Sequence, residues 1–158
     1  MPIPVIAPAG PGDLAAIREM LAEYAAWTGV DLAFQHFAQE VQGLPGDYEA
    51  PTGALLIARL EGQPVGMAAF RARKDGHCEM KRLYVRPEAR GVRLGRLLAE
   101  RIIEEAKARG YRTMLLDTLP IMKDAQRLYV ELGFVDIAPY YDSPIEGTRF
   151  MSLDLSAS

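Results

Sequence analysis

Apolar and polar positions alternate along the chain with two different periods, and these periods predict the order of the structural elements. Residues 3–7 read as a short strand. The segment Gly10-Pro11-Gly12-Asp13 is typical of a helix start, because proline and aspartate suit the first helical turn. The apolar stripe of this helix is formed by Leu14, Ile17, Leu21, Tyr24 and Ala25. Residues 28–31 interrupt the pattern, and residues 32–41 predict a second helix.

The remaining two thirds of the chain alternate between strand-like and helix-like segments. Residues 54–58 and 65–72 predict a hairpin, and a turn at Asp75-Gly76 leads into a third strand over residues 78–85. A helix over residues 94–108, a strand over 113–118 and a short helix over 125–132 follow. Residues 134–138 and 148–155 predict the last two strands. The order β-α-α-β-β-β-α-β-α-β-β predicts one α/β (α+β) domain over residues 1–158, with a mixed sheet.

Composition narrows the class of protein without identifying it. The chain is 49% hydrophobic and 25% charged with a net charge of −3, which is typical of a globular domain and argues against nucleic-acid binding. The single cysteine, Cys78, cannot form an internal disulfide. No signal-peptide pattern and no apolar run near ~20 residues is present. We therefore expect a cytoplasmic protein with no membrane partner and, since no metal-ligand spacing occurs, no metal.

The most informative stretch covers residues 83–96, which read as a strand end, a turn and a helix start. The free N–H groups and the dipole at a helix N-terminus favour an anion. The stretch also carries four arginines: Arg86, Arg90, Arg93 and Arg96. A polyphosphate site is predicted. The nucleoside-triphosphate loop is excluded because Arg96-Leu97 follows Gly95, and the dinucleotide fingerprint is excluded because Gly91 and Gly95 are four residues apart.

Two motifs in this chain resemble those of the GNAT acetyltransferase superfamily. Arg90-Gly91-Val92-Arg93-Leu94-Gly95 resembles its acetyl-CoA signature, Gln/Arg-x-x-Gly-x-Gly/Ala, with Arg93 in place of the inner glycine. Ala125-x-x-Leu128-Tyr129-x-x-Leu132-Gly133-Phe134 resembles a second element, with Met122 where the family often has asparagine. The resemblance covers nearly the whole chain. It implies a mixed, mostly antiparallel central sheet flanked by helices, whose central strands splay apart to admit the pantetheine arm of acetyl-CoA.

The resemblance also implies which residues bind acetyl-CoA. The pyrophosphate would lie on backbone N–H groups, where the glycines allow close approach and the arginines add charge-assisted contacts. The residues implied are Leu83, Tyr84, Val85, Arg90, Gly91, Val92, Arg93, Leu94, Gly95 and Arg96. For Arg86 and Arg96 the alternative is a solvated helix flank.

Two catalytic candidates follow from the same resemblance. Tyr129 matches the family's general acid, which protonates the departing thiolate, although it also fits the apolar stripe of its helix. Glu79 falls where some members carry a glutamate base. Strand alternation would put Glu79, Lys81, Leu83 and Val85 on one face, so a structural Glu79–Lys81 ion pair is the alternative. The backbone N–H near Leu83 is the expected oxyanion donor.

The acceptor is expected to be an amine. In the superfamily the acceptor pocket is commonly built from the connection of the first two helices and the loop between the last two strands, which suggests Trp27, Tyr140, Tyr141 and Asp142. Aromatic faces and carboxylates suit an amine-bearing substrate, and the alternative is tyrosines that pack on the sheet edge.

Taken together, these features predict an acetyl-CoA-dependent N-acetyltransferase in which a small amine or an amino acid attacks the thioester directly. A peptide or protein amine and a homodimer are left open. Cys78 lacks a histidine in sequence that would activate it as an acyl-carrying nucleophile. The alternative function is a catalytically weak acyl-CoA-binding module.

Overall fold

The structure is a computed structural model that describes residues 3–91 and 93–156. Its helices and strands follow the predicted order. The strands are β1 (Val5–Pro8), β2 (Ala54–Leu60), β3 (Gln63–Ala72), β4 (His77–Val85), β5 (Thr113–Thr118), β6 (Val135–Asp136) and β7 (Arg149–Asp154). The helices are α1 (Leu14–Thr28), α2 (Phe37–Gln42), α3 (Leu94–Ala108) and α4 (Lys123–Leu132). The 3-10 helices are η1 (Pro11–Asp13), η2 (Leu32–Gln35), η3 (Gly46–Tyr48) and η4 (Pro87–Ala89).

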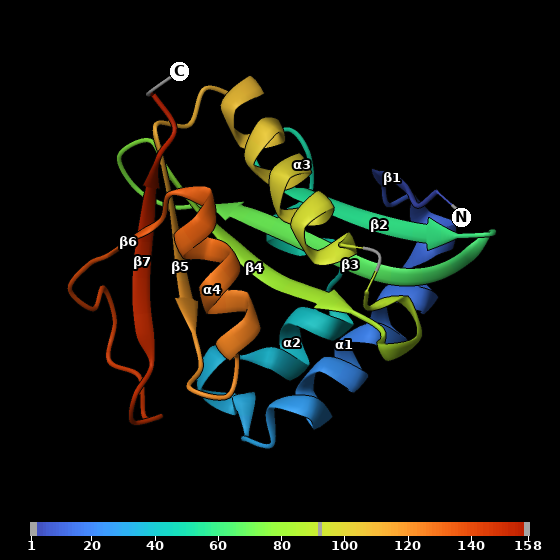
Figure 1. The fold of residues 1–158 in the computed structure, drawn as a ribbon, viewed down its shortest axis with the longest axis horizontal. Coiled ribbons are helices and arrows are strands. Elements are labelled where there is room, and N and C mark those ends of the chain that lie inside the picture. The colour runs from blue at the N-terminus through green and yellow to red at the C-terminus, as the bar shows by residue number, and fades with distance from the viewer. Residues whose placement is uncertain (1–2, 92, 157–158) are drawn as a thin grey trace.

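The strands form one sheet between two layers of helices (Figure 1). The strand order is β1-β2-β3-β4-β5-β7-β6, and every neighbouring pair is antiparallel except β4 and β5. Helices α3 and α4 cover one face, and α1 and α2 cover the other. The mixed, mostly antiparallel sheet flanked by helices is therefore confirmed. None of the described helices is long and apolar enough to cross a membrane.

The only parallel pair of the described sheet, β4 and β5, separates part-way along its length. Pairing joins residues 77–79 of β4 to residues 113–115 of β5 and then stops. The rest of β4 and the end of β5 extend past this point without pairing to each other. The splayed central strands are thus confirmed, and the gap opens beside Lys81, Leu83 and Asp117.

Helix α3 packs closely on the sheet because its apolar positions recur every four residues. Leu94, Leu98, Ile102 and Ala106 are all buried in the core on this face. A Cβ atom at Gly66 of β3 would lie 3.0 Å from Leu98 Cδ1, so the glycine permits this approach. The start of α3 is therefore held directly above the separating strands.

A bulge in β4 changes which side chains face each layer. Lys81 lies opposite Ala69 of β3 and Tyr84 lies opposite Met67, so β4 holds one extra residue between these pairs. Arg82, at this point, has a φ of 61°. Leu83 and Val85 consequently pack on the side of α3, whereas Lys81 faces the other layer. The expectation that Glu79, Lys81, Leu83 and Val85 share one face is wrong, because it assumes an unbroken two-residue period.

The helix predicted over residues 32–41 is divided into η2 and α2. Asp31 accepts a hydrogen bond of 2.9 Å from the Ala33 N–H and so caps η2. His36 then takes a left-handed conformation with a φ of 57°, which ends η2 and starts α2 in a new direction. The strand predicted over residues 134–138 is also shorter, since β6 contains two residues.

Candidate active site

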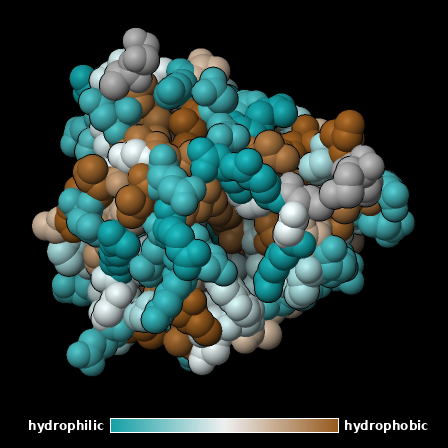
Figure 2. Space-filling model, in the orientation of Figure 1, coloured by the Kyte–Doolittle hydropathy of each residue, from teal (hydrophilic) through white to brown (hydrophobic). Residues whose placement is uncertain are grey.

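An open groove of about 470 Å³ lies where β4 leaves β5 and α3 begins. The surface is hollowed here between α3 and α4, with apolar side chains on the floor (Figure 2). Its lining brings together residues from three parts of the chain that are distant in sequence: Trp27, Leu83, Tyr84, Val85, Arg90, Gly91, Arg93, Leu94, Gly95, Ile121, Asp124, Ala125 and Leu128. Most of the residues predicted to bind acetyl-CoA therefore share one groove, which we call the donor groove. Val92 lies outside the described residues.

Two of the four arginines near this groove are engaged by carboxylates of the protein. Arg86 donates to Glu23 at 2.8 Å and to the Pro64 carbonyl at 3.0 Å. Arg96 pairs with Glu100 at 3.2 Å and with Glu131 at 3.1 Å. These contacts agree with the helix-flank interpretation for Arg96, which does not line the donor groove. Arg86 does not fit that interpretation, because it directly follows β4 and its side chain is only 17% exposed.

The other two arginines line the donor groove. Arg90 uses its Nε to donate to the Val85 carbonyl at 3.0 Å, and its guanidinium lies 6.0 Å from the Trp27 ring centroid. Arg93 holds the N-cap position of α3 with a φ of 59°. The superfamily pattern has glycine here, and the left-handed conformation explains that preference. Because Arg93 keeps the glycine-like backbone, its departure from the pattern adds a cation without changing the turn.

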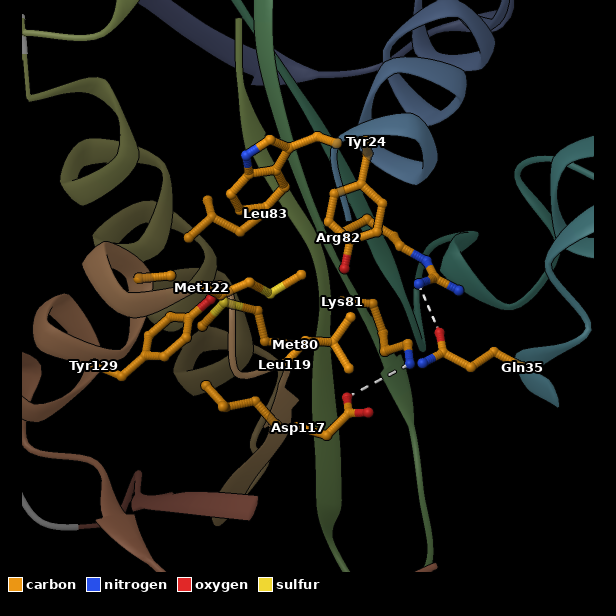
Figure 3. A pocket seen from close by; sticks show the side chains of 13 residues that line it. Tyr24, Gln35, Met80, Lys81, Arg82, Leu83, Asp117, Leu119, Met122 and Tyr129 are labelled. Atoms are coloured by element: carbon orange, nitrogen blue, oxygen red, sulfur yellow. Dashed lines mark hydrogen bonds and ion pairs between the residues drawn. The ribbon is translucent and has the colours of Figure 1, made fainter. Parts of the chain in front are cut away.

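A narrow cavity of about 50 Å³ continues from the donor groove into the gap between β4 and β5 (Figure 3). The two share Trp27, Leu83 and Ala125 as lining residues. The cavity is further lined by Tyr129 of α4 on one side and by Lys81 and Asp117 on the other. It therefore crosses the sheet between the two helical layers.

Tyr129 belongs to the core and also reaches the narrow cavity. Its side chain is buried in the core, and its ring packs against Phe134 with centroids 5.6 Å apart. The residue also lines the narrow cavity, and no described residue accepts a hydrogen bond from its hydroxyl. Burial raises the pKa of this phenol above its ordinary value, and Tyr24 and Asp117 raise it further. Tyr129 thus remains a neutral hydrogen-bond donor over the physiological pH range.

A second cavity, of about 200 Å³, opens on the opposite layer and shares Gln35 and Lys81 with the narrow cavity. Its lining residues come from η2, the turn after η2, β3, the β3–β4 turn, β4 and the β6–β7 loop. They are Phe34, Gln35, His36, Arg71, Arg73, Glu79, Lys81 and Tyr141. We call this the acceptor cavity. The donor groove, the narrow cavity and the acceptor cavity form one series through the sheet.

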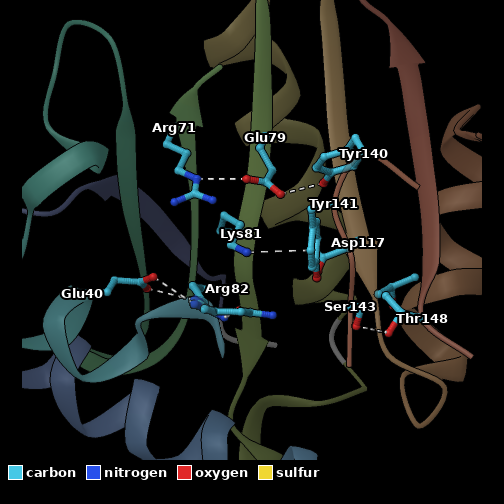
Figure 4. Close-up of polar contacts among 12 residues, drawn as sticks. Glu40, Arg71, Glu79, Lys81, Arg82, Asp117, Tyr140, Tyr141, Ser143 and Thr148 are labelled. Atoms are coloured by element: carbon cyan, nitrogen blue, oxygen red, sulfur yellow. Dashed lines mark hydrogen bonds and ion pairs between the residues drawn. The ribbon is translucent and has the colours of Figure 1, made fainter. Parts of the chain in front are cut away.

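Glu79 is buried at the centre of a charged cluster in the acceptor cavity (Figure 4). Its Oε1 accepts from Arg71 Nε at 2.9 Å and lies 3.5 Å from an Arg73 nitrogen, while Oε2 accepts from the Tyr140 hydroxyl at 2.6 Å. Burial raises the pKa of Glu79, but Lys81, Tyr140 and Arg71 outweigh burial and hold the pKa below its ordinary value. Glu79 is therefore ionised at neutral pH.

Lys81 pairs with a different carboxylate from the one the sequence suggests. Its Nζ lies 3.8 Å from Asp117 Oδ1, and the two side chains are only 4% and 7% exposed. The Tyr141 hydroxyl donates to Asp117 Oδ2, so this carboxylate has a second partner. Burial lowers the pKa of Lys81, and Asp117 and Glu79 only partly oppose this effect.

Comparison with known proteins identifies the architecture around these cavities. The sequence profile described as "Acetyltransferase (GNAT) family" matches residues 14–134. The chain belongs to the GNAT acetyltransferase family. An uncharacterised N-acetyltransferase of Schizosaccharomyces pombe is 42% identical over 148 residues, covering 92% of this chain and 91% of the relative.

Solved structures agree with this assignment. A putative acyl-CoA N-acyltransferase from Klebsiella pneumoniae has a TM-score of 0.78 and 28% identity, covering 97% of this chain and 98% of its own. A putative acetyltransferase from Salmonella typhimurium, solved with its cofactor acetyl-CoA, has a TM-score of 0.69 and 26% identity, covering 98% and 95%. This GNAT protein is accordingly an acetyl-CoA-dependent acyltransferase. No group of three or more metal-ligating residues occurs in its described part.

The residues suggested for the acceptor lie in different places of this GNAT site. Trp27 is 38% exposed and lines the donor groove and the narrow cavity rather than the acceptor cavity. Tyr140 and Tyr141 both pack on Phe150, with ring centroids 5.2 and 5.1 Å away, and turn their hydroxyls toward strand carboxylates. Asp142 is exposed and does not line the acceptor cavity. Both tyrosines thus pack on the sheet; Tyr141 lines the acceptor cavity, whereas Tyr140 does not line it and is hydrogen-bonded to Glu79.

Three cationic side chains of the site escaped the sequence analysis. Arg71 lies directly opposite Glu79 in the β3–β4 hairpin, and pairing outward from the turn at Asp75-Gly76 could have revealed it. Arg73 follows the last residue of β3 and lies nearer than Arg71 to the same turn. Arg82 gave no comparable signal, because its buried position depends on the bulge. Its guanidinium donates to both carboxylate oxygens of Glu40 at 2.9 Å.

Proposed function

We propose that this GNAT protein transfers the acetyl group of acetyl-CoA directly to the primary amine of a small molecule, preferably an amino acid. The observation that carries the proposal is the series of three cavities through the splayed strands. A donor bound in the groove and an amine bound in the acceptor cavity would approach each other from opposite layers. The narrow cavity between them is lined by Tyr129 and Leu83.

The donor groove suits the diphosphate end of acetyl-CoA. A Cβ atom at Gly91 would meet no atom within 4 Å, and one at Gly95 would meet only Val85 Cγ2 at 3.9 Å. The protein itself therefore leaves this backbone uncovered, as an approaching phosphate requires. Arg90 and Arg93 add two cations beside it, and the apolar floor with Leu83 and Ala125 suits the pantetheine arm.

Direct attack is favoured because the chain's one cysteine is not a usable nucleophile. Cys78 is fully buried in the core beneath α3, and burial raises the pKa of its thiol to about 12. In the proposed reaction the amine nitrogen bonds to the carbonyl carbon of the thioester. The carbon–sulfur bond breaks, and the electron pair leaves with the sulfur. The backbone N–H near Leu83 is the proposed donor to the oxyanion.

Three proton transfers complete the reaction: the acceptor's ammonium loses one proton before attack, its nitrogen loses a second to solvent water after bonding to the carbonyl carbon, and the departing thiolate gains one. Tyr129 gives its proton to the departing thiolate, a role supported by its neutral hydroxyl at the narrow cavity. The acceptor's ammonium must lose a proton before attack, and two carboxylates face the route: Glu79 from the acceptor cavity and Asp117 from the narrow cavity. Glu79 is the proposed base. Its lowered pKa means that any proton it takes is passed quickly to water.

The names of related proteins support an amino-acid acceptor. A protein of Danio rerio named N-acetylaspartate synthetase is 33% identical over 102 residues, covering 63% of this chain. That name refers to an acetylated amino acid, and the acceptor cavity of about 200 Å³ has room for a molecule of this kind. We infer an amino acid rather than a protein side chain as the preferred acceptor.

The test is Tyr129→Phe, assayed by thiol release from acetyl-CoA over a panel of amines. Loss of the proton donor should lower kcat by about 10²- to 10⁴-fold while leaving the affinity for acetyl-CoA unchanged, since the hydroxyl makes no hydrogen bond to a described residue. Tyr111→Phe is the matched control. Its hydroxyl donates to the Thr52 carbonyl, away from the three cavities, so kcat should not change.

Two results would contradict this proposal. An unchanged kcat in Tyr129→Phe would leave the residue with its packing role alone. Binding of acetyl-CoA by calorimetry without turnover of any amine would instead support an acyl-CoA-binding module.

A further inference from the structure

The acceptor cavity is dominated by positive charge. Its described lining contains Arg71, Arg73 and Lys81 but only one carboxylate, Glu79. That carboxylate already accepts from Arg71 and Tyr140 and lies beside Arg73. The described lining therefore offers no further carboxylate to bind a second positive charge on the substrate. The sequence suggested Tyr140 and Tyr141 as part of a surface that binds an amine. Their hydroxyls instead donate hydrogen bonds to Glu79 and Asp117.

We propose that the amine acceptor of this protein carries a carboxylate, which Lys81, Arg71 and Arg73 bind in the acceptor cavity. The inference rests on the proposed function, because it names the substrate class of the same site. It deepens the proposed amino-acid acceptor by naming the carboxylate as the group that is recognised, and it assigns three residues to that recognition.

Lys81 is the residue that most needs a partner. Its side chain is 4% exposed, its one ion pair spans 3.8 Å, and no described residue lies within hydrogen-bond distance of its ammonium. An ammonium has three donors, and a buried charge is costly unless it is hydrogen-bonded. Lys81 lines both the narrow cavity and the acceptor cavity, so its ammonium stands at their junction. A substrate carboxylate placed there would supply the missing acceptor.

The two arginines supply further donors in a fixed orientation. Arg71 uses Nε toward Glu79, and Arg73 uses one terminal nitrogen, which leaves other N–H groups of both guanidinium groups for a ligand. The Arg73 guanidinium also lies 4.8 Å from the Tyr140 ring centroid. Glu79 and Tyr140 therefore position both forks beside the cavity. Guanidinium forks match the geometry of a carboxylate.

The position of Lys81 also restricts the shape of the acceptor. A carboxylate bound at the junction lies next to the gap in which the thioester would react. Its amine must therefore be separated from the carboxylate by only one or two carbon atoms. α-Amino and β-amino acids satisfy this condition, whereas a diamine brings a second positive charge to a positively charged wall.

The experiment compares alanine, β-alanine, aspartate and glutamate with their matched carboxamides and with 1,4-diaminobutane. Thiol release gives kcat/KM for each acceptor at saturating acetyl-CoA. An amide has a less basic amine and so offers more free nucleophile at neutral pH, which biases the comparison against the proposal. Wild type should still prefer at least one acid to its amide by about tenfold or more, the value of a charge-assisted hydrogen bond.

Variants of Arg73 test whether the arginines of the acceptor cavity cause the preference for the acid over its amide. Arg73→Gln should reduce the preference for the acid about tenfold, mainly through KM, and Arg73→Glu should reverse it. Arg73 is chosen because its side chain is 32% exposed, so the fold should tolerate the change. Arg112→Gln, an exposed arginine outside the acceptor cavity, is the control and should keep the preference.

The outcomes separate this inference from the proposed function. Turnover of amides or 1,4-diaminobutane as fast as of the acids would overturn the inference and leave the function standing. If no amine is acetylated, the shift in melting temperature caused by each acid and by its amide, measured in the presence of coenzyme A, decides between the outcomes. Stabilisation by an acid but not by its amide, lost in Arg73→Gln, supports the carboxylate-binding pocket while the proposed function fails. If the acid does not stabilise the protein in this way, both the inference and the proposed function are overturned.

Discussion

The ion pair between Arg82 and Glu40 yields the sharpest prediction, because it ties the β4 bulge to α2. The Arg82 side chain is 2% exposed and that of Glu40 is 15% exposed. Two nitrogens of Arg82 bind the two carboxylate oxygens at 2.9 Å, and a third contact joins Gln35 at 2.7 Å. Glu40→Ala would leave a buried guanidinium with Gln35 as its remaining hydrogen-bond partner.

The expected cost follows from this geometry. Removing one partner of a buried pair costs about 3–5 kcal/mol, and the remaining Gln35 contact places this case near the lower end, at about 3 kcal/mol. For a domain of this size the melting temperature should fall by about 6–12 °C. Arg127→Ala, which removes an exposed pair with Asp124, is the control and should cost no more than about 0.5 kcal/mol.

Chemical denaturation at several pH values measures the effect and its electrostatic origin. Burial raises the pKa of Glu40, but Arg82 outweighs burial and holds it below the ordinary value of 4.5. A carboxyl with a lowered folded-state pKa stabilises the protein above its unfolded-state pKa and loses that contribution as pH falls through the folded-state value. The difference in free energy of unfolding between wild type and Glu40→Ala should therefore be fully present above pH 4.5 and decrease below it. A Glu40→Ala protein as stable as the Arg127→Ala control at pH 7 would refute the reasoning.

Two further predictions concern the chemistry of the site. Glu79→Gln should lower kcat and move the acidic limb of the pH–rate profile, whereas Asp117→Asn should leave that limb in place. The reverse result would make Asp117 the base. Glu79 would then be a residue that positions the arginines. Cys78→Ala should lower the free energy of unfolding by about 1–2 kcal/mol through the small cavity it leaves but should not change kcat. Loss of turnover in a folded Cys78→Ala protein, or an acetyl group on Cys78 by mass spectrometry, would contradict direct transfer.

The donor side of the site could be predicted from the sequence because its determinants are local. Arg90 to Gly95 form one turn before one helix, and Tyr129 lies on a single helix whose end is marked by Gly133. Local spacing is sufficient to place such residues. The separation of β4 and β5 also followed, through the resemblance that these two motifs carry.

The acceptor side could not be predicted in the same way, since its residues meet through tertiary contacts. The left-handed conformation of Arg82 has no local signal, because glycine or asparagine is the residue expected at such a φ. The contacts with Glu40 and Gln35 hold it there, and both lie more than 40 residues away. Because the bulge could not be predicted, the two-residue period placed Leu83 and Val85 on the wrong face. The cationic residues of the acceptor cavity were not predicted either.

The bulge at Arg82 is what allows one strand to line both the acceptor cavity and the donor groove. Before it, Glu79 and Lys81 line the acceptor cavity, and after it, Leu83 and Val85 line the donor groove. A regular strand would put all four side chains in one layer, so that one of the two cavities would lose two side chains that β4 now gives it. In the proposed reaction, the pair that stabilises the bulge would therefore also align the two substrates. Glu40→Ala, assayed well below its melting temperature, should accordingly lower kcat even though Glu40 does not line the narrow cavity.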